Sequence, residues 1–240
     1  MSVEPHPQTG QPVGLSVDPT PARRPGPVTL QGRFGRVEKL ATDHAVSLWE
    51  TVRGHDAIWT YMSQYGPFES AAAFSAWVAL RVALEDPYSY AICDRQGRAV
   101  GIFTLMEIRP AMRVCEVGHV VYSPALQRTP LATEAQYLLA RYVFETLGYR
   151  RYEWKCHSGN EPSRRAALRF GFNFECIMRQ HMIAKGRNRD TAWFAMLDGE
   201  WPDRKARFER WLSADNFDID GRQKKSLGQM TRGERPWPED

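Results

Sequence analysis

The residues from 127 to 133 combine polar side chains, small side chains and a proline directly ahead of a helical pattern. Residues 115–122 read as a strand that the Ser123-Pro124 pair ends, and apolar side chains recur at helical spacing from Ala135 to Thr146. A helix that begins behind such a loop offers unpaired backbone N–H groups and the positive end of its dipole. These groups can bind a phosphate without a dedicated cation, so the segment predicts an anion site. An ordinary strand-to-helix connection is the alternative.

A second polar segment follows after one helix and one strand. Asn160, Glu161, Pro162 and Ser163 precede a helical stretch that ends at Gly171-Phe172. Together with Gln127-x-x-Pro130-x-Ala132, this segment resembles the two cofactor motifs of the GNAT superfamily of acetyl-CoA-dependent N-acetyltransferases. The resemblance covers residues 28–198 and is closest to the branch that includes the Rim-type protein N-terminal acetyltransferases. It implies an acetyl-CoA-dependent N-acetyltransferase with an α/β (α+β) GNAT fold, in which helices flank a mixed, mostly antiparallel sheet of about seven strands.

The resemblance implies a catalytic base on the strand beside the cofactor. Glu116 stands eleven residues before Gln127. A carboxylate there takes the ammonium proton of the acceptor, directly or through water, once partial burial has raised its pKa. A salt-bridged strand carboxylate is the structural alternative. His119 is the competing base, although in a regular strand it points to the opposite face, and only a bulge would bring it round.

Most cofactor contacts implied by the resemblance are main-chain groups. Backbone N–H groups between Arg128 and Thr133 bind the pyrophosphate, and the Arg128 side chain adds charge. The N–H of Val120 polarises the thioester carbonyl, while the next two residues pair with the pantetheine amides. Pro130 departs from the family pattern, because it stands at the central glycine and has no N–H to donate. The expected cofactor-binding residues are Val120, Val121, Tyr122, Gln127, Arg128, Thr129, Leu131, Ala132, Thr133 and Asn160.

The proton donor for the leaving thiolate is the least defined group. The tyrosine that many family members carry seven residues after the motif asparagine is Ala167 here. Ser163 is the expected catalytic substitute, with a helix-capping serine as the alternative. The missing tyrosine and Pro130 also leave a second class of function open, a noncatalytic acyl-CoA-binding or protein-interaction domain of the same fold.

The acceptor groove of the family corresponds to residues 59–68 and 185–190. Aromatic side chains together with Arg187 and Arg189 suit an acceptor that has an apolar part and a carboxylate or phosphate. A packed aromatic core and a solvated turn explain the same residues. The expected acceptor is a small amine or a peptide N-terminus, and the sequence does not choose between them.

Composition excludes several other classes. The 240 residues are 42% hydrophobic and 25% charged, as in an ordinary soluble domain, and the net charge of +4 comes with no long basic block or nucleic-acid motif. Residues 71–84 are the most apolar segment, yet they are too short to cross a membrane. The four separated cysteines and the lack of clustered histidines indicate reduced thiols, with no metal site. We therefore expect a cytoplasmic enzyme without nucleic-acid or membrane partners, and a homodimer stays open.

Three parts are expected along the chain. Residues 1–27 are rich in proline and predict a disordered extension, residues 28–200 form the acetyltransferase domain, and residues 201–240 add a short helix and a polar tail. Within the domain, helices are expected near residues 43–54, 70–84, 135–148 and 162–170. The seven expected strands cover residues 28–38, 88–93, 99–108, 115–122, 151–156, 174–184 and 191–197.

Overall fold

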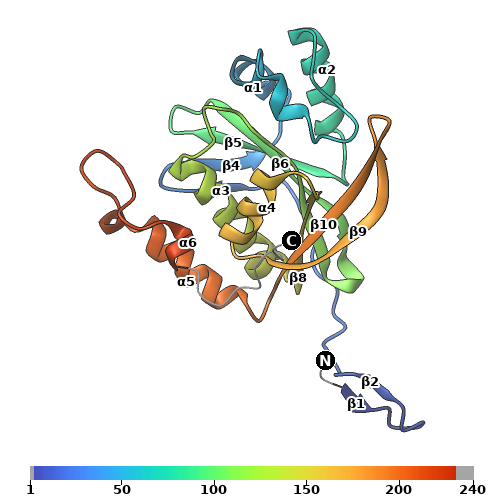
Figure 1. Cartoon of the computed structure of the whole chain (residues 1–240). Coiled ribbons are helices and arrows are strands. Elements are labelled where there is room, and N and C mark those ends of the chain that lie inside the picture. The colour runs from blue at the N-terminus through green and yellow to red at the C-terminus, as the bar shows by residue number, and fades with distance from the viewer. Residues whose placement is uncertain (1–2, 231–240) are drawn as a thin grey trace.

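The computed structural model describes residues 3–230, in which a twisted mixed sheet carries helices on both faces (Figure 1). Eight strands lie in the order β3-β4-β5-β6-β7-β8-β10-β9. All neighbours are antiparallel except β7 and β8, which are parallel and are joined through a helix. The bounds are Thr29–Gln31 (β3), Gly35–Lys39 (β4), Tyr88–Asp94 (β5), Ala99–Arg109 (β6), Val114–Tyr122 (β7), Arg151–His157 (β8), Asn173–Ala184 (β9) and Arg187–Leu197 (β10).

Two groups of helices cover the two faces of the sheet. The helices are α1 (His44–Val52), α2 (Ala71–Val82), α3 (Pro130–Arg141), α4 (Glu161–Arg169), α5 (Trp201–Leu212) and α6 (Leu227–Met230), and α3 continues as a π-helical turn over Tyr142–Leu147. Helices α1 and α2 pack on the face that includes Ala91, Ile102 and Val121. Helices α3, α4 and α5 pack on the opposite face, which includes Ile92 and Phe103. No helix within residues 3–230 has both the length and the apolar composition needed to cross a membrane.

The first expected strand, residues 28–38, is a hairpin of two strands. Its turn is held by Glu134 of α3, whose buried carboxylate accepts the N–H groups of Arg33 at 2.6 Å and Phe34 at 2.7 Å. A Cβ atom on Gly32 would overlap this carboxylate, so any larger residue there would displace Glu134 from the turn. The sheet therefore has eight strands where the sequence predicts about seven.

The N-terminal segment has more structure than its composition predicts. β1 (Val3–Pro5) and β2 (Pro12–Gly14) form a hairpin that stands apart from the main sheet (Figure 1). Further along, the N–H of Ala22 donates to the carbonyl of Pro110 at 3.0 Å, and the N–H of Arg23 donates to that of Leu147 at 2.8 Å. These bonds attach the end of the extension to the domain.

The C-terminal extension packs on the helix that follows the predicted phosphate loop. Trp201 of α5 stacks on Phe144 with ring centroids 5.3 Å apart, and Phe208 lies 5.7 Å from Tyr137 of α3. The expected short helix is therefore α5. After it, the buried side chains of Asn216 and of Leu227 in α6 fold residues 213–230 back onto α5. Residues 231–240 of the expected tail lie outside the described residues.

Candidate active site

A bulge in β7 interrupts the sheet beside the predicted base. The β7–β8 ladder ends at Val117 opposite Trp154, and within the described structure β7 continues to Tyr122 without pairing with β8. On its other side, two β7 residues, His119 and Val120, oppose a single residue of β6. The φ of His119 is 47°, in the left-handed region. A bulge of this kind bends its strand, so β7 presents main-chain groups at a gap next to β8.

The same bulge turns His119 toward the face that carries Glu116. Thr104 shares that face with Glu116, and its Oγ1 lies 3.4 Å from His119 Nδ1. The condition set for His119 in the sequence analysis is thus met. However, burial and the charges of Arg81 and Arg189 lower the pKa of His119 to about 3. The imidazole is neutral and is a weak base at neutral pH.

Glu116 lies in a buried row of ionised groups. Its side chain is 8% exposed, and Lys155 Nζ lies 2.9 Å from Glu116 Oε2 and 3.0 Å from Glu153 Oε2. Burial raises the pKa of Glu116 to about 7, against the opposing effect of Lys155. Glu116 is therefore both the ion-paired strand carboxylate of the structural alternative and a group in the pKa range of a general base.

Lys155 is the partner that sequence reasoning missed. In a strand that alternates apolar and charged residues, a charged side chain such as that of Lys155 is expected to face solvent. The parallel register pairs Glu116 with Glu153, which puts Lys155, two residues further along β8, on the same face. The Lys155 ammonium also lies 3.8 Å from the ring centroid of Trp193. An i, i+2 pattern of charges within one strand is the signal that points to such a row.

The loop ahead of α3 is a capped helix start. Thr129 is the N-cap residue, and its Oγ1 accepts the N–H of Ala132 at 3.2 Å. The N–H of Thr129 itself donates to the carbonyl of Leu126 at 3.2 Å. Among residues 3–230, the N–H groups of Arg128 and Leu131 have no hydrogen-bond partner. The loop can therefore offer an anion fewer amides than the predicted range from 128 to 133 contains.

Pro130 occupies the first helical position of α3. A residue at this position has no acceptor for its N–H within the helix, so proline removes no helical hydrogen bond there. The preceding Arg128 has a φ of 61°, and the side chain of Gln127 donates to the carbonyl of Tyr122 at 2.8 Å. At Pro130 itself, the departure from the family pattern costs no helical hydrogen bond.

A cation that the sequence analysis did not assign stands at the first turn of α3. Arg169 of α4 donates from Nη1 to Thr133 Oγ1 at 3.0 Å, and its guanidinium lies 5.4 Å from the centroid of the Trp211 ring. Burial lowers the pKa of Arg169, and no carboxylate in the described part of the chain pairs with it. Thr133 is one of the expected cofactor-binding residues. Its hydroxyl accepts from Arg169 and so positions the guanidinium beside the loop.

Asn160 and Ser163 of the second motif have different structural roles. Asn160 is the N-cap of α4, and its Oδ1 accepts the N–H of Ser163 at 3.2 Å. The capping alternative for Ser163 is therefore wrong. Its Oγ instead accepts the indole N–H of Trp154 at 3.0 Å, which leaves the hydroxyl hydrogen available for donation. Trp154 belongs to the core on the α3–α4 side, so Ser163 and Glu116 lie on opposite faces of the sheet.

The two segments expected to form the acceptor groove lie against each other. Lys185 in the β9–β10 turn donates from Nζ to the carbonyl of Trp59 at 3.0 Å, and the Arg189 guanidinium donates to the Ser63 hydroxyl. Trp59 is buried in the core, as the structural alternative for this aromatic segment predicts. Tyr61 is 41% exposed.

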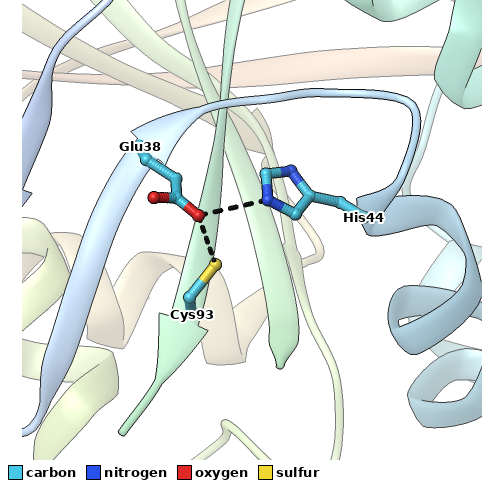
Figure 2. Close-up of side chains that lie close together, drawn as sticks. All are labelled: Glu38, His44 and Cys93. Atoms are coloured by element: carbon cyan, nitrogen blue, oxygen red, sulfur yellow. Dashed lines mark hydrogen bonds and ion pairs between the residues drawn. The ribbon is translucent and has the colours of Figure 1, made fainter. Parts of the chain in front are cut away.

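Figure 2 shows a second group of ionisable side chains, Glu38, His44 and Cys93, at β4, α1 and β5. Their polar atoms lie within 4.8 Å of one another, a spacing that suits a metal ion. However, the N–H of Ala41 donates to His44 Nδ1 at 3.1 Å, so Nε2 carries the proton and donates to Glu38. The Cys93 thiol and the Arg36 guanidinium also donate to this carboxylate. These bonds leave His44 no free lone pair and mark a structural cluster that attaches α1 to the sheet.

Comparisons with known proteins agree with this geometry. A family model described as an acetyltransferase (GNAT) domain matches residues 36–173. The crystal structure of a GCN5-related N-acetyltransferase from Brucella melitensis is 45% identical, with a TM-score of 0.85 over 88% of this chain and 97% of that chain.

Two further matches concern the Rim-type branch. The "Putative ribosomal N-acetyltransferase YdaF" of Bacillus subtilis is 28% identical over 109 residues, which are 45% of this chain, and the match spans 59% of the length of that relative. A structure of RimL, the ribosomal L7/L12 alpha-N-protein acetyltransferase, in complex with coenzyme A shares the fold at 18% identity, with a TM-score of 0.62 over 71% of this chain and 98% of that chain. The resemblance to this branch expected from the sequence is confirmed.

Proposed function

Because the chain belongs to the GNAT acetyltransferase family, we propose that it moves an acetyl group from acetyl-CoA to a primary amine by direct attack in a ternary complex. The observation that carries the proposal is the state of Glu116. This carboxylate is buried beside the gap between β7 and β8, and its pKa of about 7 suits proton transfer near neutral pH.

Glu116 takes the proton of the acceptor ammonium as the amine attacks. A carboxyl group with a pKa near the working pH is about half ionised and still holds the proton that it receives. Lys155 orients the carboxylate, but it shares its charge with Glu153 and so does not suppress the basicity of Glu116. His119 is the poorer base because its pKa lies near 3.

The acetyl thioester occupies the gap that opens after Val117. The N–H of Val120, in the bulged part of β7, polarises the thioester carbonyl, and the edge at Val121 and Tyr122 pairs with the pantetheine amides as an added strand would. A thioester in this gap has Glu116 on one face of the sheet and the Ser163 hydroxyl on the other. Ser163 then donates a proton to the departing thiolate.

The diphosphate of acetyl-CoA binds at the start of α3. The free N–H groups of Arg128 and Leu131 and the positive end of the helix dipole are the main-chain part of this site. The guanidinium groups of Arg128 and Arg169 add charge, and Arg169 is held in place by Thr133.

The acceptor amine enters on the α1–α2 face, between residues 59–68 and the β9–β10 hairpin. This direction follows from the side of the sheet on which Glu116 lies. A small amine and a peptide N-terminus both satisfy this geometry. The name of the B. subtilis relative supports the peptide N-terminus.

The direct test is mass spectrometry of peptides and small amines incubated with the purified protein and acetyl-CoA. The expected result is the mass of one acetyl group added to an amine, accompanied by release of a free thiol. If acetyl-CoA raises the melting temperature but no acceptor is modified, the chain is a noncatalytic acyl-CoA-binding domain. If acetyl-CoA neither binds nor reacts, both functions are refuted.

A further inference from the structure

Two arginines on the acceptor side of the sheet have no acidic partner. Arg81 of α2 is 8% exposed, and its guanidinium lies 4.7 Å from the ring centroid of Tyr65 and 5.5 Å from that of Trp77. Arg189 of β10 donates to Ser63, and its Nε atom is buried without a hydrogen-bond partner. Neither arginine forms an ion pair with a carboxylate among residues 3–230.

Both positive charges act on the space beside the proposed base. Each lowers the pKa of His119, and the charge of Glu116 in turn acts on Arg189. The ring of His119 lies 5.5 Å from that of Tyr65. Arg81, through Tyr65, and Arg189 are therefore both near His119, on the side of the sheet where an acceptor amine has to stand for Glu116 to remove its proton.

Tyr65 adds a neutral donor to this group. Its hydroxyl is buried without a well-formed hydrogen bond, and burial raises the pKa of Tyr65 to about 12, so the hydroxyl keeps its proton. The Tyr65 hydroxyl and Arg189 Nε are thus two buried donors that lack an acceptor in the described part of the chain.

Such an arrangement is costly unless a ligand completes it. A buried cation without a counter-ion loses hydration and gains no ion pair in return. Several buried or half-buried arginines elsewhere in the molecule do have acidic partners: Arg36 pairs with Glu38, Arg151 with Glu175, and Arg207 with Asp203. Arg81 and Arg189 lack such a partner within residues 3–230 and lie on the side where the acceptor is proposed to bind, as Arg169 lacks one on the side proposed for the diphosphate.

We propose that the acceptor carries a carboxylate close to its reactive amine, and that this carboxylate binds between Arg189, Arg81 and the hydroxyl of Tyr65. Planar guanidinium groups match a carboxylate in shape and charge. The orientation, with the amine toward Glu116, rests on the proposed function. The carboxylate belongs either to a free amino acid or to an acidic side chain near a peptide N-terminus.

The test is calorimetric binding to the full-length protein saturated with coenzyme A, which needs no turnover. Each ligand is compared with a form in which one carboxylate is replaced by an amide: a peptide beginning Ser-Glu with one beginning Ser-Gln, and glutamate with its α-amide. We expect the carboxylate member of one pair to bind about tenfold tighter or more. The pair that shows this difference identifies the source of the carboxylate.

Variants of Arg189, Arg179 and Ser63 test whether Arg189 causes the difference in affinity between the carboxylate and amide ligands. Arg189→Gln should abolish the preference for the carboxylate. Arg179→Gln removes one positive charge from an exposed position on β9 of the same hairpin and should keep it. Ser63→Ala removes the contact of Arg189 with the loop but leaves the charge, and it should also keep the preference. Arg81→Gln provides a second test if its melting temperature shows that it folds.

Equal binding within both pairs, no binding of any of the ligands, or a preference that survives in Arg189→Gln would overturn the proposal. Acetyl transfer is measured separately on the same ligands. Transfer without discrimination leaves the transferase standing and refutes the carboxylate site. Discrimination without transfer supports the carboxylate site and refutes the transferase.

Discussion

Two glutamates of the same sheet have opposite electrostatic states. The carboxylate of Glu38 accepts from the side chains of Arg36, His44 and Cys93, and its pKa is lowered to about 2, mainly through Arg36. Glu116 shares a single cation with another carboxylate, and burial raises its pKa to about 7. Glu38 is half-buried, with a side chain 20% exposed, whereas Glu116 is buried. What distinguishes the structural carboxylate from the reactive one here is its weaker burial together with the larger number of donors that it receives.

The largest effect expected from this contrast is the loss of activity in Glu116→Gln. The substitution keeps the shape of the side chain but removes the base, so we expect kcat to fall by about a hundredfold to ten-thousandfold. The rate of acetyl transfer from acetyl-CoA measures it. The melting-temperature shift with acetyl-CoA should stay the same, and a fall in kcat of less than about tenfold would assign the base to another group.

Glu38→Gln should instead act on stability. The amide removes the negative charge and one of the two acceptor oxygens that Arg36, His44 and Cys93 share, and we expect the free energy of unfolding to fall by about 2–3 kcal/mol. Urea unfolding measures it. Glu161→Gln, in an exposed pair with Arg165, is the control and should cost less than about 0.5 kcal/mol.

The effect of Glu38 on stability also has a defined pH window. Its folded-state pKa of about 2 lies below the ordinary value of 4.5, so its contribution is complete above pH 4.5 and is lost as the pH falls toward 2. A difference between wild type and Glu38→Gln that stays constant down to pH 2 would contradict this account.

The pH dependence of the rate sharpens the same contrast. Glu116 has to be ionised to accept a proton, and its pKa is about 7, so kcat/KM should rise by roughly tenfold per pH unit below pH 7 and level off above it. Initial rates at saturating acetyl-CoA measure this limb. The same rise of kcat/KM with pH should be seen in Glu38→Gln. If the residual activity of Glu116→Gln rises with the same midpoint pH, Glu116 is not the titrating group.

A smaller effect is expected from the arginines of α4. Arg169 has no carboxylate partner among residues 3–230, whereas Arg165 on the same helix is exposed and pairs with Glu161. If Arg169 meets a phosphate, Arg169→Gln should raise the Kd for coenzyme A by about threefold to tenfold, and Arg165→Gln should leave it unchanged. Calorimetric titration of both variants decides this, and equal Kd values would remove Arg169 from the cofactor site.

Local patterns predicted most of the elements but not the contacts that span the chain. The strand and helix periods located β5 to β8 and α2 to α4 within a few residues, because apolar alternation and caps are local properties. The prediction of a single strand at residues 28–38 was wrong for a different reason. Its turn is held by Glu134, about a hundred positions away, and no window of sequence contains that interaction.

The candidate site also contains residues that could be predicted from the sequence and residues that could not. The loop before α3 was predicted from residue type and spacing, and Glu116 and Asn160 were predicted through the resemblance to the family. The direction of His119 depends on a bulge, and the proximity of Lys155 to Glu116 depends on the register between two strands joined through a helix. The position of Arg169 beside the loop depends on its contacts with α3 and with the C-terminal extension, which the local sequence does not show.

The position of β10 bears on how this protein can be produced. The family-matched residues 36–173 stop before β10, which lies next to β8 in the sheet, and before α5, which shields Tyr137 and Phe144. A product trimmed to those residues would leave a bare strand edge and uncovered aromatic rings, both of which promote aggregation. Soluble expression therefore requires the chain to extend at least through Leu212.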